Sequence, residues 1–160
     1  YYLEDYVSYA GAFESALLIL VAEGVFVKFP QLKAVFIEFG FTWLPACLWR
    51  FEKTWRGVRM EIPWVDRPPA AIVRDHIRFT LQPVDAPPRA EQFERVLEQM
   101  GSDRLLLFST DYPHWQFDGN AALPREISGA LARRILVDNP LDTYPRLAET
   151  LQPTAKERVI

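Results

Sequence analysis

The sequence is poor in the residues that build covalent and metal-binding frameworks. Among its 160 residues there are one cysteine and two histidines. A single cysteine cannot form an internal disulfide, and it excludes a zinc site built from cysteines. Cys47 lies in the apolar stretch of residues 43–49, so we expect a buried structural thiol and not a nucleophile. The lack of disulfides favours a reducing, cytoplasmic location.

The sequence also lacks an excess of charge of one sign and a long hydrophobic run. Charged residues make up 24% of the chain and the formal net charge is -3. This balance does not have the basic footprint of a nucleic-acid-binding protein. The longest apolar run, residues 16–22, is too short to cross a bilayer, and no basic leader segment precedes it. We therefore expect neither nucleic acid nor membrane as a partner.

Several catalytic signatures are missing as well. The chain contains no glycine-rich phosphate loop, no Gly-x-Ser-x-Gly motif, and no His-x-x-x-His or Cys-x-x-Cys pair. Two histidines alone cannot form a histidine-rich metal site.

Hydrophobic patterning predicts an alternation of helices and strands, with two proline-containing loops and a polar tail. Such alternation indicates an α/β fold with parallel strands and crossover helices. The expected helices cover residues 9–27, 43–55, 70–75, 90–100 and 127–137, with a short closing helix to about 147; the expected strands cover 32–38, 77–81 and 104–109.

Three strands are few for an independent α/β domain. A TIM-type (β/α)8 barrel needs ~250 residues, so this chain would supply somewhat less than half of one. We expect residues 1–147 to form the C-terminal part of such a barrel, and residues 148–160 to form a polar tail.

Asp111 is the strongest candidate for a functional residue. It follows the apolar segment 104–109, and ligands of α/β proteins bind beyond the C-terminal ends of strands. A carboxylate there can bind a divalent metal or accept a proton. A helix N-cap or an Asx turn would explain an aspartate at this position equally well.

Two further residues share this position at strand ends. Glu38 ends an apolar strand and must be paired or face a cleft; a catalytic role and an ion pair with Arg50 carry equal weight. His114, three residues after Asp111, either supports Asp111 or binds substrate, or lies in the loop without a role. His76 precedes a strand, and we expect it to be structural.

Residues 108–114, Phe-Ser-Thr-Asp-Tyr-Pro-His, resemble the last barrel strand of the amidohydrolase-related (amidohydrolase 2) family, which includes aminocarboxymuconate-semialdehyde decarboxylase. Residues 23–35 resemble its helix-to-strand passage, residues 135–144 resemble its closing helix, and residues 41–45 resemble an uncharacterised subgroup. The motifs occur in the family's order up to about residue 147.

This resemblance implies a TIM-type barrel with one catalytic divalent metal, often zinc. It places Asp111 on the aspartate that binds or approaches that metal. Glu38 falls where the decarboxylases carry a catalytic histidine, and the subgroup has serine where this chain has Phe39. The family's metal histidines would lie upstream of Tyr1, so the remaining ligands are expected outside this chain.

The leading hypothesis is a metal-dependent hydrolase or decarboxylase that acts on a small carboxylated organic substrate as part of an intact barrel. Asp111 would be the metal ligand and proton acceptor, Glu38 a second acid or base, and His114 a supporting catalytic residue. The alternative is an inactive half-barrel that acts as a binding or oligomerising module. Open strand edges favour association into a homo-oligomer in either case.

Overall fold

The computed structural model of the chain describes residues 1–114, 117, 119, 122–127 and 129–150. Helices and strands alternate as the sequence predicts. In order they are α1 (Tyr2–Ala22), α2 (Val25–Lys28), β1 (Ala34–Phe36), α3 (Leu44–Val58), η1 (Arg59–Glu61), α4 (Pro69–His76), β2 (Ile77–Thr80), α5 (Ala90–Met100), β3 (Leu106–Leu107), α6 (Gly129–Arg133), the π-helical η3 (Arg134–Asp138), α7 (Asn139–Thr143) and α8 (Pro145–Thr150).

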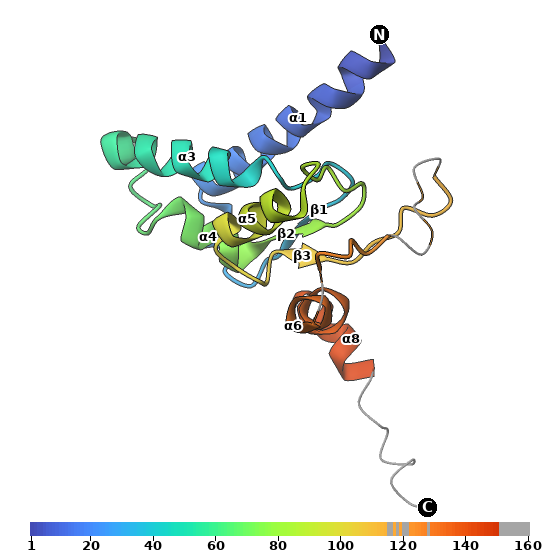
Figure 1. Cartoon of the computed structure of the whole chain (residues 1–160). Helices are drawn as coiled ribbons and strands as arrows, with labels where there is room; N and C mark the ends of the chain where they lie inside the picture. The colour runs from blue at the N-terminus through green and yellow to red at the C-terminus, as the bar shows by residue number, and fades with distance from the viewer. Residues whose placement is uncertain (115–116, 118, 120–121, 128, 151–160) are drawn as a thin grey trace, which may run out of the picture.

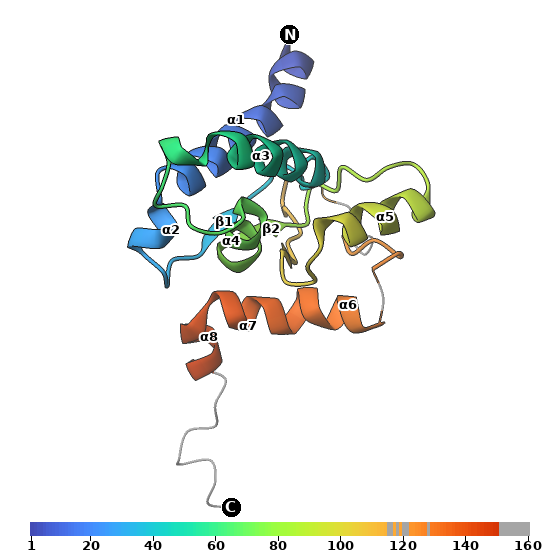
Figure 2. The same ribbon diagram turned by 90° about the vertical axis from the view of Figure 1, so that its left-hand side faces the viewer.

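The three strands form one parallel sheet in the order β1-β2-β3. Phe36 of β1 pairs with Phe79 of β2, which pairs with Leu106 of β3. All four residues of β2 are buried, because helices lie on both sides of the strands: α1 and α3 on one side and α6–α8 on the other (Figures 1 and 2). The parallel α/β arrangement with crossover helices is confirmed, and β1 and β3 are its two edges.

Aromatic rings from consecutive elements pack where the helices meet the sheet. Phe13 of α1 contacts Phe36 edge to face at 5.0 Å between centroids, and Phe36 contacts Phe79 at 5.5 Å. Trp43, next to α3, meets the opposite side of Phe79 at 5.7 Å. Such pairs contribute about 0.5–1.5 kcal/mol each beyond their area burial. They therefore help to fix α1 and α3 on the strands that carry the candidate site.

The first helix differs from the prediction at both ends. It begins at Tyr2 and ends at Ala22, where a single helix over residues 9–27 was expected. Gly24 interrupts the predicted helix because it adopts a left-handed conformation with φ 69°. The Trp64 ring lies so close to Gly24 that an added Cβ would be 2.6 Å from Cδ1. Its indole N–H donates to the Ala22 carbonyl at 2.7 Å, which satisfies an end of α1.

The strands are shorter than predicted, and the last helical region is divided. Two to four residues pair in each strand, because the chain beyond β1 and β3 turns away from the ladder into the loops of the candidate site. The helix expected over residues 127–137 begins at Gly129 and continues through η3 and α7. The prediction for α5, residues 90–100, is confirmed. The predicted polar tail, residues 148–160, begins within α8, which ends at Thr150, and the rest of it lies outside the described residues.

The N-terminal half of α1 projects from the body of the molecule (Figure 1). Over an 18-residue window its mean hydropathy is 1.3, so by length and composition it is the one described helix that could cross a membrane. The apolar run considered in the sequence was shorter than this window. Leu17 and Val21 in the C-terminal half are buried in the core, so contacts assign that half to the folded body.

A buried arginine joins three elements at the N-terminal ends of the strands. Arg78 of β2 is 1% exposed. Its guanidinium donates to the carbonyls of Arg74 and Ile77 at 3.1 and 2.8 Å, and to Asp142 Oδ2 of α7 at 2.9 Å. The positive charge therefore ties the C-terminal end of α4 to α7. This end of the sheet is structural, as expected for the N-terminal face of a barrel.

Cys47 of α3 provides a direct test of the fold. Burial, helped by the nearby Glu14 carboxylate, raises the pKa of the thiol from 9.0 to about 12. Since the thiolate is the reactive form, the folded chain should react with iodoacetamide at pH 8 about a thousandfold more slowly than the chain unfolded in urea. Mass spectrometry of alkylation measures both rates. Equal rates would contradict the packing of α1 against α3.

Candidate functional site

Glu38 lies just beyond the C-terminal end of β1. Its φ of 73° is in the left-handed region, which residues other than glycine seldom adopt. The Glu38 N–H donates to the Thr80 hydroxyl at 3.0 Å, so the last residue of β2 holds the backbone in this conformation. Such conformations cost on the order of 1–3 kcal/mol and cluster at functional sites.

Asp111 follows β3 and has the same unusual backbone. Its φ is 57°, and among the described residues only Asp111 and Glu38 combine a side chain with a positive φ. The Asp111 side chain is 10% exposed. Nearby, the Gln82 N–H donates to the Ser109 hydroxyl at 3.1 Å, which connects the loop after β2 to the segment leading to Asp111. The loops after all three strands therefore support one another.

The two carboxyl groups meet. A hydrogen bond between the Glu38 and Asp111 side chains is the main cause that raises the pKa of Glu38, and desolvation and the negative charge of Asp111 act in the same direction. The His114 ring opposes this shift. With its pKa raised in this way, Glu38 keeps its proton to a higher pH than an isolated glutamate does.

His114 joins this pair from the Asp111 side. Its Nδ1 atom lies 3.1 Å from Asp111 Oδ2, and its backbone N–H donates to the Asp111 carbonyl at 2.7 Å. The turn therefore orients the imidazole against the carboxylate. None of the described helices begins at Asp111, so the N-cap explanation for this residue is wrong. All three predicted site residues are brought together.

Two other sequence hypotheses are also decided. Among the described residues Glu38 is paired with Asp111 and not with Arg50, which lies on α3 beside Glu14 in a groove against α1. His76 is structural, as predicted: it is buried, its Nδ1 atom lies 2.9 Å from the Leu32 carbonyl, and its ring stacks on Phe26 at 4.6 Å.

The donor set is short for a catalytic metal. No group of three histidine, cysteine, aspartate or glutamate side chains within the described ranges is arranged to hold a metal ion. Catalytic zinc usually takes three protein ligands. Asp111 also engages Glu38 and His114 at the same time. The residues that the structure describes therefore do not complete a divalent-metal site by themselves.

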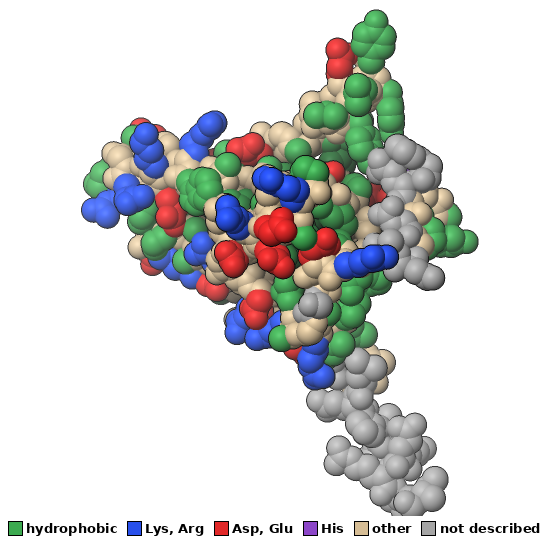
Figure 3. All heavy atoms as spheres, in the orientation of Figure 1, with side chains coloured by type: hydrophobic (Ala, Val, Ile, Leu, Met, Phe, Trp, Pro, Cys, Tyr) green, Lys and Arg blue, Asp and Glu red, His purple; other side chains and the backbone are tan. Residues whose placement is uncertain are grey.

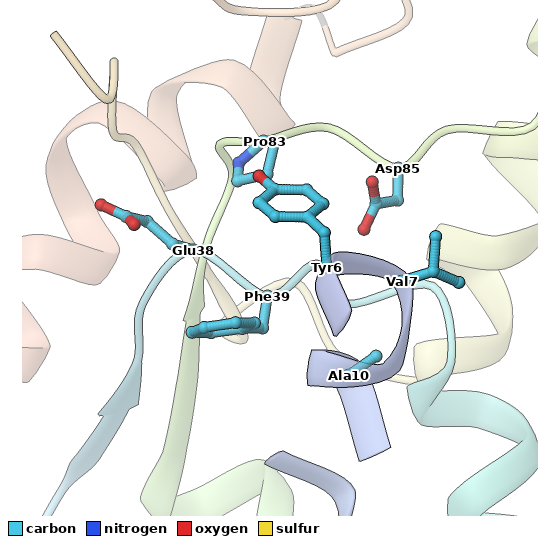
Figure 4. Close-up of a pocket in the computed structure, with 7 residues that line it drawn as sticks. All are labelled: Tyr6, Val7, Ala10, Glu38, Phe39, Pro83 and Asp85. Atoms are coloured by element: carbon cyan, nitrogen blue, oxygen red, sulfur yellow. The ribbon is translucent and has the colours of Figure 1, made fainter. Parts of the chain in front are cut away.

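A pocket of about 180 Å³ opens beside Glu38. Figure 4 shows that Tyr6 from α1 lies between Glu38 and Asp85, with Phe39 below and Pro83 behind. Phe39 stacks on Phe13 at 4.2 Å, so this bulky residue is anchored in the aromatic core. The lining residues are Tyr6, Val7, Ala10, Glu38, Phe39, Pro83 and Asp85.

The sequence did not single out several residues that shape this region. Thr80 and Ser109 hold the loops, and Asp85 and Tyr6 line the pocket. A proline-rich loop after a predicted strand is the signal that could have pointed to Asp85. Tyr6 carries no comparable local signal, because its position depends on how α1 packs.

Comparisons with known proteins identify the family and bear on the fold. The amidohydrolase family model matches residues 7–146. An amidohydrolase from Mycobacterium avium subsp. paratuberculosis K-10 has a similar structure, with a TM-score of 0.65 and 24% identity over 84% of this chain and 33% of that one. The 5-carboxyvanillate decarboxylase LigW from Sphingomonas paucimobilis gives 0.56 and 20%, over 79% and 37%. No curated protein matches the chain significantly.

The chain spans about a third of the length of both structures. At these identities the structures bear on the fold alone, and they agree with a parallel sheet that forms the C-terminal part of a TIM-type barrel. The match of the family model extends over most of the sequence. Superfamily members are enzymes and generally depend on a divalent metal. The chain belongs to the amidohydrolase family.

Proposed function

We propose that this chain forms the C-terminal part of the active site of a metal-dependent hydrolase or decarboxylase, in the cytoplasm, acting on a small carboxylated organic substrate. The observation that carries this proposal is the meeting of Glu38, Asp111 and His114 beyond the C-terminal ends of β1 and β3. Family membership supports the class of reaction, and the decarboxylase among similar structures supports carboxylate loss as one form of it.

Glu38 and Asp111 would transfer protons in this proposal. Glu38, whose pKa is raised, would donate a proton to the carbon that has lost carbon dioxide or to a leaving heteroatom, and the Asp111 carboxylate would accept a proton from water or substrate. His114 holds the Asp111 carboxylate in position through the Nδ1 contact. Asp111 is also one ligand of the divalent metal, which we propose to be zinc. The remaining ligands come from outside the described residues, so no step is assigned to the metal here.

A second candidate function is a binding or oligomerising module without catalysis. It is favoured by the incomplete donor set and by the apolar surface of α1. Tyr2, Leu3 and Val7 are 65%, 72% and 69% exposed, and Figure 3 shows hydrophobic side chains along this projecting end of the helix. The metal content of the complete barrel separates the two functions.

In the complete barrel, Glu38→Gln should lower kcat by about a hundredfold or more, because general acid–base catalysis contributes ~10²–10⁴. The free energy of unfolding should change by less than about 1 kcal/mol, since Glu38 makes no ion pair with a lysine or arginine in the described part of the chain. Carbon dioxide release from 5-carboxyvanillate, and hydrolysis of a panel of aryl amides and esters, measure the turnover.

Glu94→Gln is the matched control, because it removes one exposed carboxylate of α5 far from the site. It should leave both turnover and stability unchanged. A Glu38→Gln variant that unfolds readily but turns over normally would assign Glu38 to stability and remove it from catalysis.

The 160-residue chain alone should not retain stoichiometric zinc. Asp111 and His114 supply two donors at most to a site that usually takes three protein ligands, and Glu38 is bonded to Asp111. Elemental analysis after exhaustive dialysis should find well under one metal ion per chain. One firmly held ion per chain would overturn this assignment of ligands.

We further propose that the isolated chain associates with itself. β1 and β3 are both edge strands, and unpaired edges next to exposed apolar side chains drive association. The simplest assembly is a two-fold dimer with an interface of ~2,000 Å² or more. Light scattering across a dilution series should show a dimer; a stable, folded monomer at low micromolar concentration would contradict it.

A further inference from the structure

The pocket beside Glu38 is lined by acidic, aromatic and apolar side chains. Its seven lining residues include two acidic side chains, the rings of Tyr6 and Phe39, and the apolar groups of Val7, Ala10 and Pro83. No lysine, arginine or histidine is among the described residues that line it. The described lining therefore presents negative charge and aromatic ring faces. It presents no positively charged group to which an anionic ligand could bind.

Asp85 is the acidic residue of the pocket that has no partner among the described residues. In the described part of the chain it makes no hydrogen bond or ion pair. Asp85 is exposed, yet partial loss of water around its carboxyl group raises its pKa, and no cation among the described residues opposes that shift. Figure 4 shows the carboxylate directed toward the Tyr6 ring and Val7.

The backbone of the loop after β1 is shaped around this carboxylate. Gly40 has a φ of 65°, and a Cβ added to it would overlap Asp85 Oδ2. A side chain at position 40 would therefore displace Asp85 from its present position. The glycine lets a charged group lie against the wall of the pocket at a place where it has no partner of its own.

We propose that this pocket binds a primary ammonium group carried by a small aromatic molecule. Asp85 attracts the cation, and the face of Tyr6 adds a cation–π contact. Val7, Ala10 and Phe39 cover the apolar remainder. A neutral hydroxyl group would gain a single hydrogen bond, and a carboxylate would be repelled by Asp85 without compensation.

The pocket's position relative to Glu38 gives this ammonium group a role, which rests on the proposed function. The amine end of the substrate would be held by Asp85, and the end that reacts would extend toward Glu38 and Asp111. The carboxylate expected from family resemblance would then lie at the reacting end, away from Asp85. Binding of the amine itself needs neither the metal nor turnover.

Three probes of the same shape test the charge preference on the 160-residue chain: 2-phenylethylammonium, 2-phenylethanol and 3-phenylpropionate. Isothermal titration calorimetry, with NMR line broadening for weak binding, measures each affinity. The ammonium compound should bind at least about tenfold more tightly than the alcohol, and the carboxylate should bind most weakly. Added salt should reduce this difference.

Variants locate the site. Asp85→Asn keeps the shape next to Gly40 and should weaken binding of the ammonium probe about tenfold while leaving the alcohol unchanged. Tyr6→Leu should weaken the ammonium probe a few-fold. Glu94→Gln is the control for net charge and should have no effect. Circular dichroism verifies that each variant is folded.

The proposal is overturned if the three probes bind the unaltered chain equally, if none binds, or if Asp85→Asn binds the ammonium probe as tightly as the original. These outcomes do not depend on catalysis. Loss of turnover in Glu38→Gln with no amine binding would leave the proposed function standing and remove this pocket from it.

Discussion

Parallel pairing of three short strands decides where every candidate functional group can lie. Because Phe36, Phe79 and Leu106 lie in one register across the sheet, the segments that leave the strands all begin at the same C-terminal end of the sheet. Glu38, Gln82 and Asp111 follow the three strands at this end. The hydroxyl groups of Thr80 and Ser109 then fix the positions of these segments, because each accepts a hydrogen bond from the backbone of a neighbouring segment. A shift of register would separate the carboxyl pair.

The contact between the Glu38 and Asp111 carboxyl groups is energetically unfavourable. Two acidic groups in contact repel when both are ionised, and both residues also hold left-handed backbone conformations. His114 offsets part of the repulsion from the Asp111 side. At the opposite end of the strands Arg78 is surrounded by carbonyl oxygens and Asp142. The acidic pair therefore lies at the C-terminal ends of the strands, and the buried, paired charge of Arg78 lies at their N-terminal ends.

Much of this arrangement could be predicted from local pattern. The spacing of apolar residues predicted α5 and both of its ends correctly. Apolar runs followed by a charged residue drew attention to Glu38 and Asp111. The position of His114 three residues after Asp111 suggested that the two side chains lie close together, and the Nδ1 atom is 3.1 Å from Asp111 Oδ2. These features depend on neighbours in sequence, where spacing carries the information.

The rest depends on contacts between distant segments. Gly24 ends the helix early because Trp64 occupies the space beside it, and no pattern near residue 24 reveals that tryptophan. The approach of Glu38 to Asp111 arises from strand order, whereas the sequence alone suggested Arg50 as a possible partner of Glu38. Asp85 gains significance from Gly40 and Tyr6, which lie on other elements. A charged residue in a proline-rich loop is ordinary until its surroundings are known.

The same geometry links the carboxyl pair to the pocket beside Glu38. Glu38 belongs to both: its backbone follows β1, its carboxyl group meets Asp111, and its stem lines the cavity with Tyr6 and Asp85. A ligand held by Asp85 and Tyr6 is therefore oriented relative to Glu38 by α1 and the loop after β2, without help from the far edges of the sheet. Those edges, β1 and β3, are where further strands would have to pair and bring additional ligands to Asp111. Recognition by the pocket and completion of a metal site thus depend on different surfaces of the chain, so the chain can retain the first while it lacks the second.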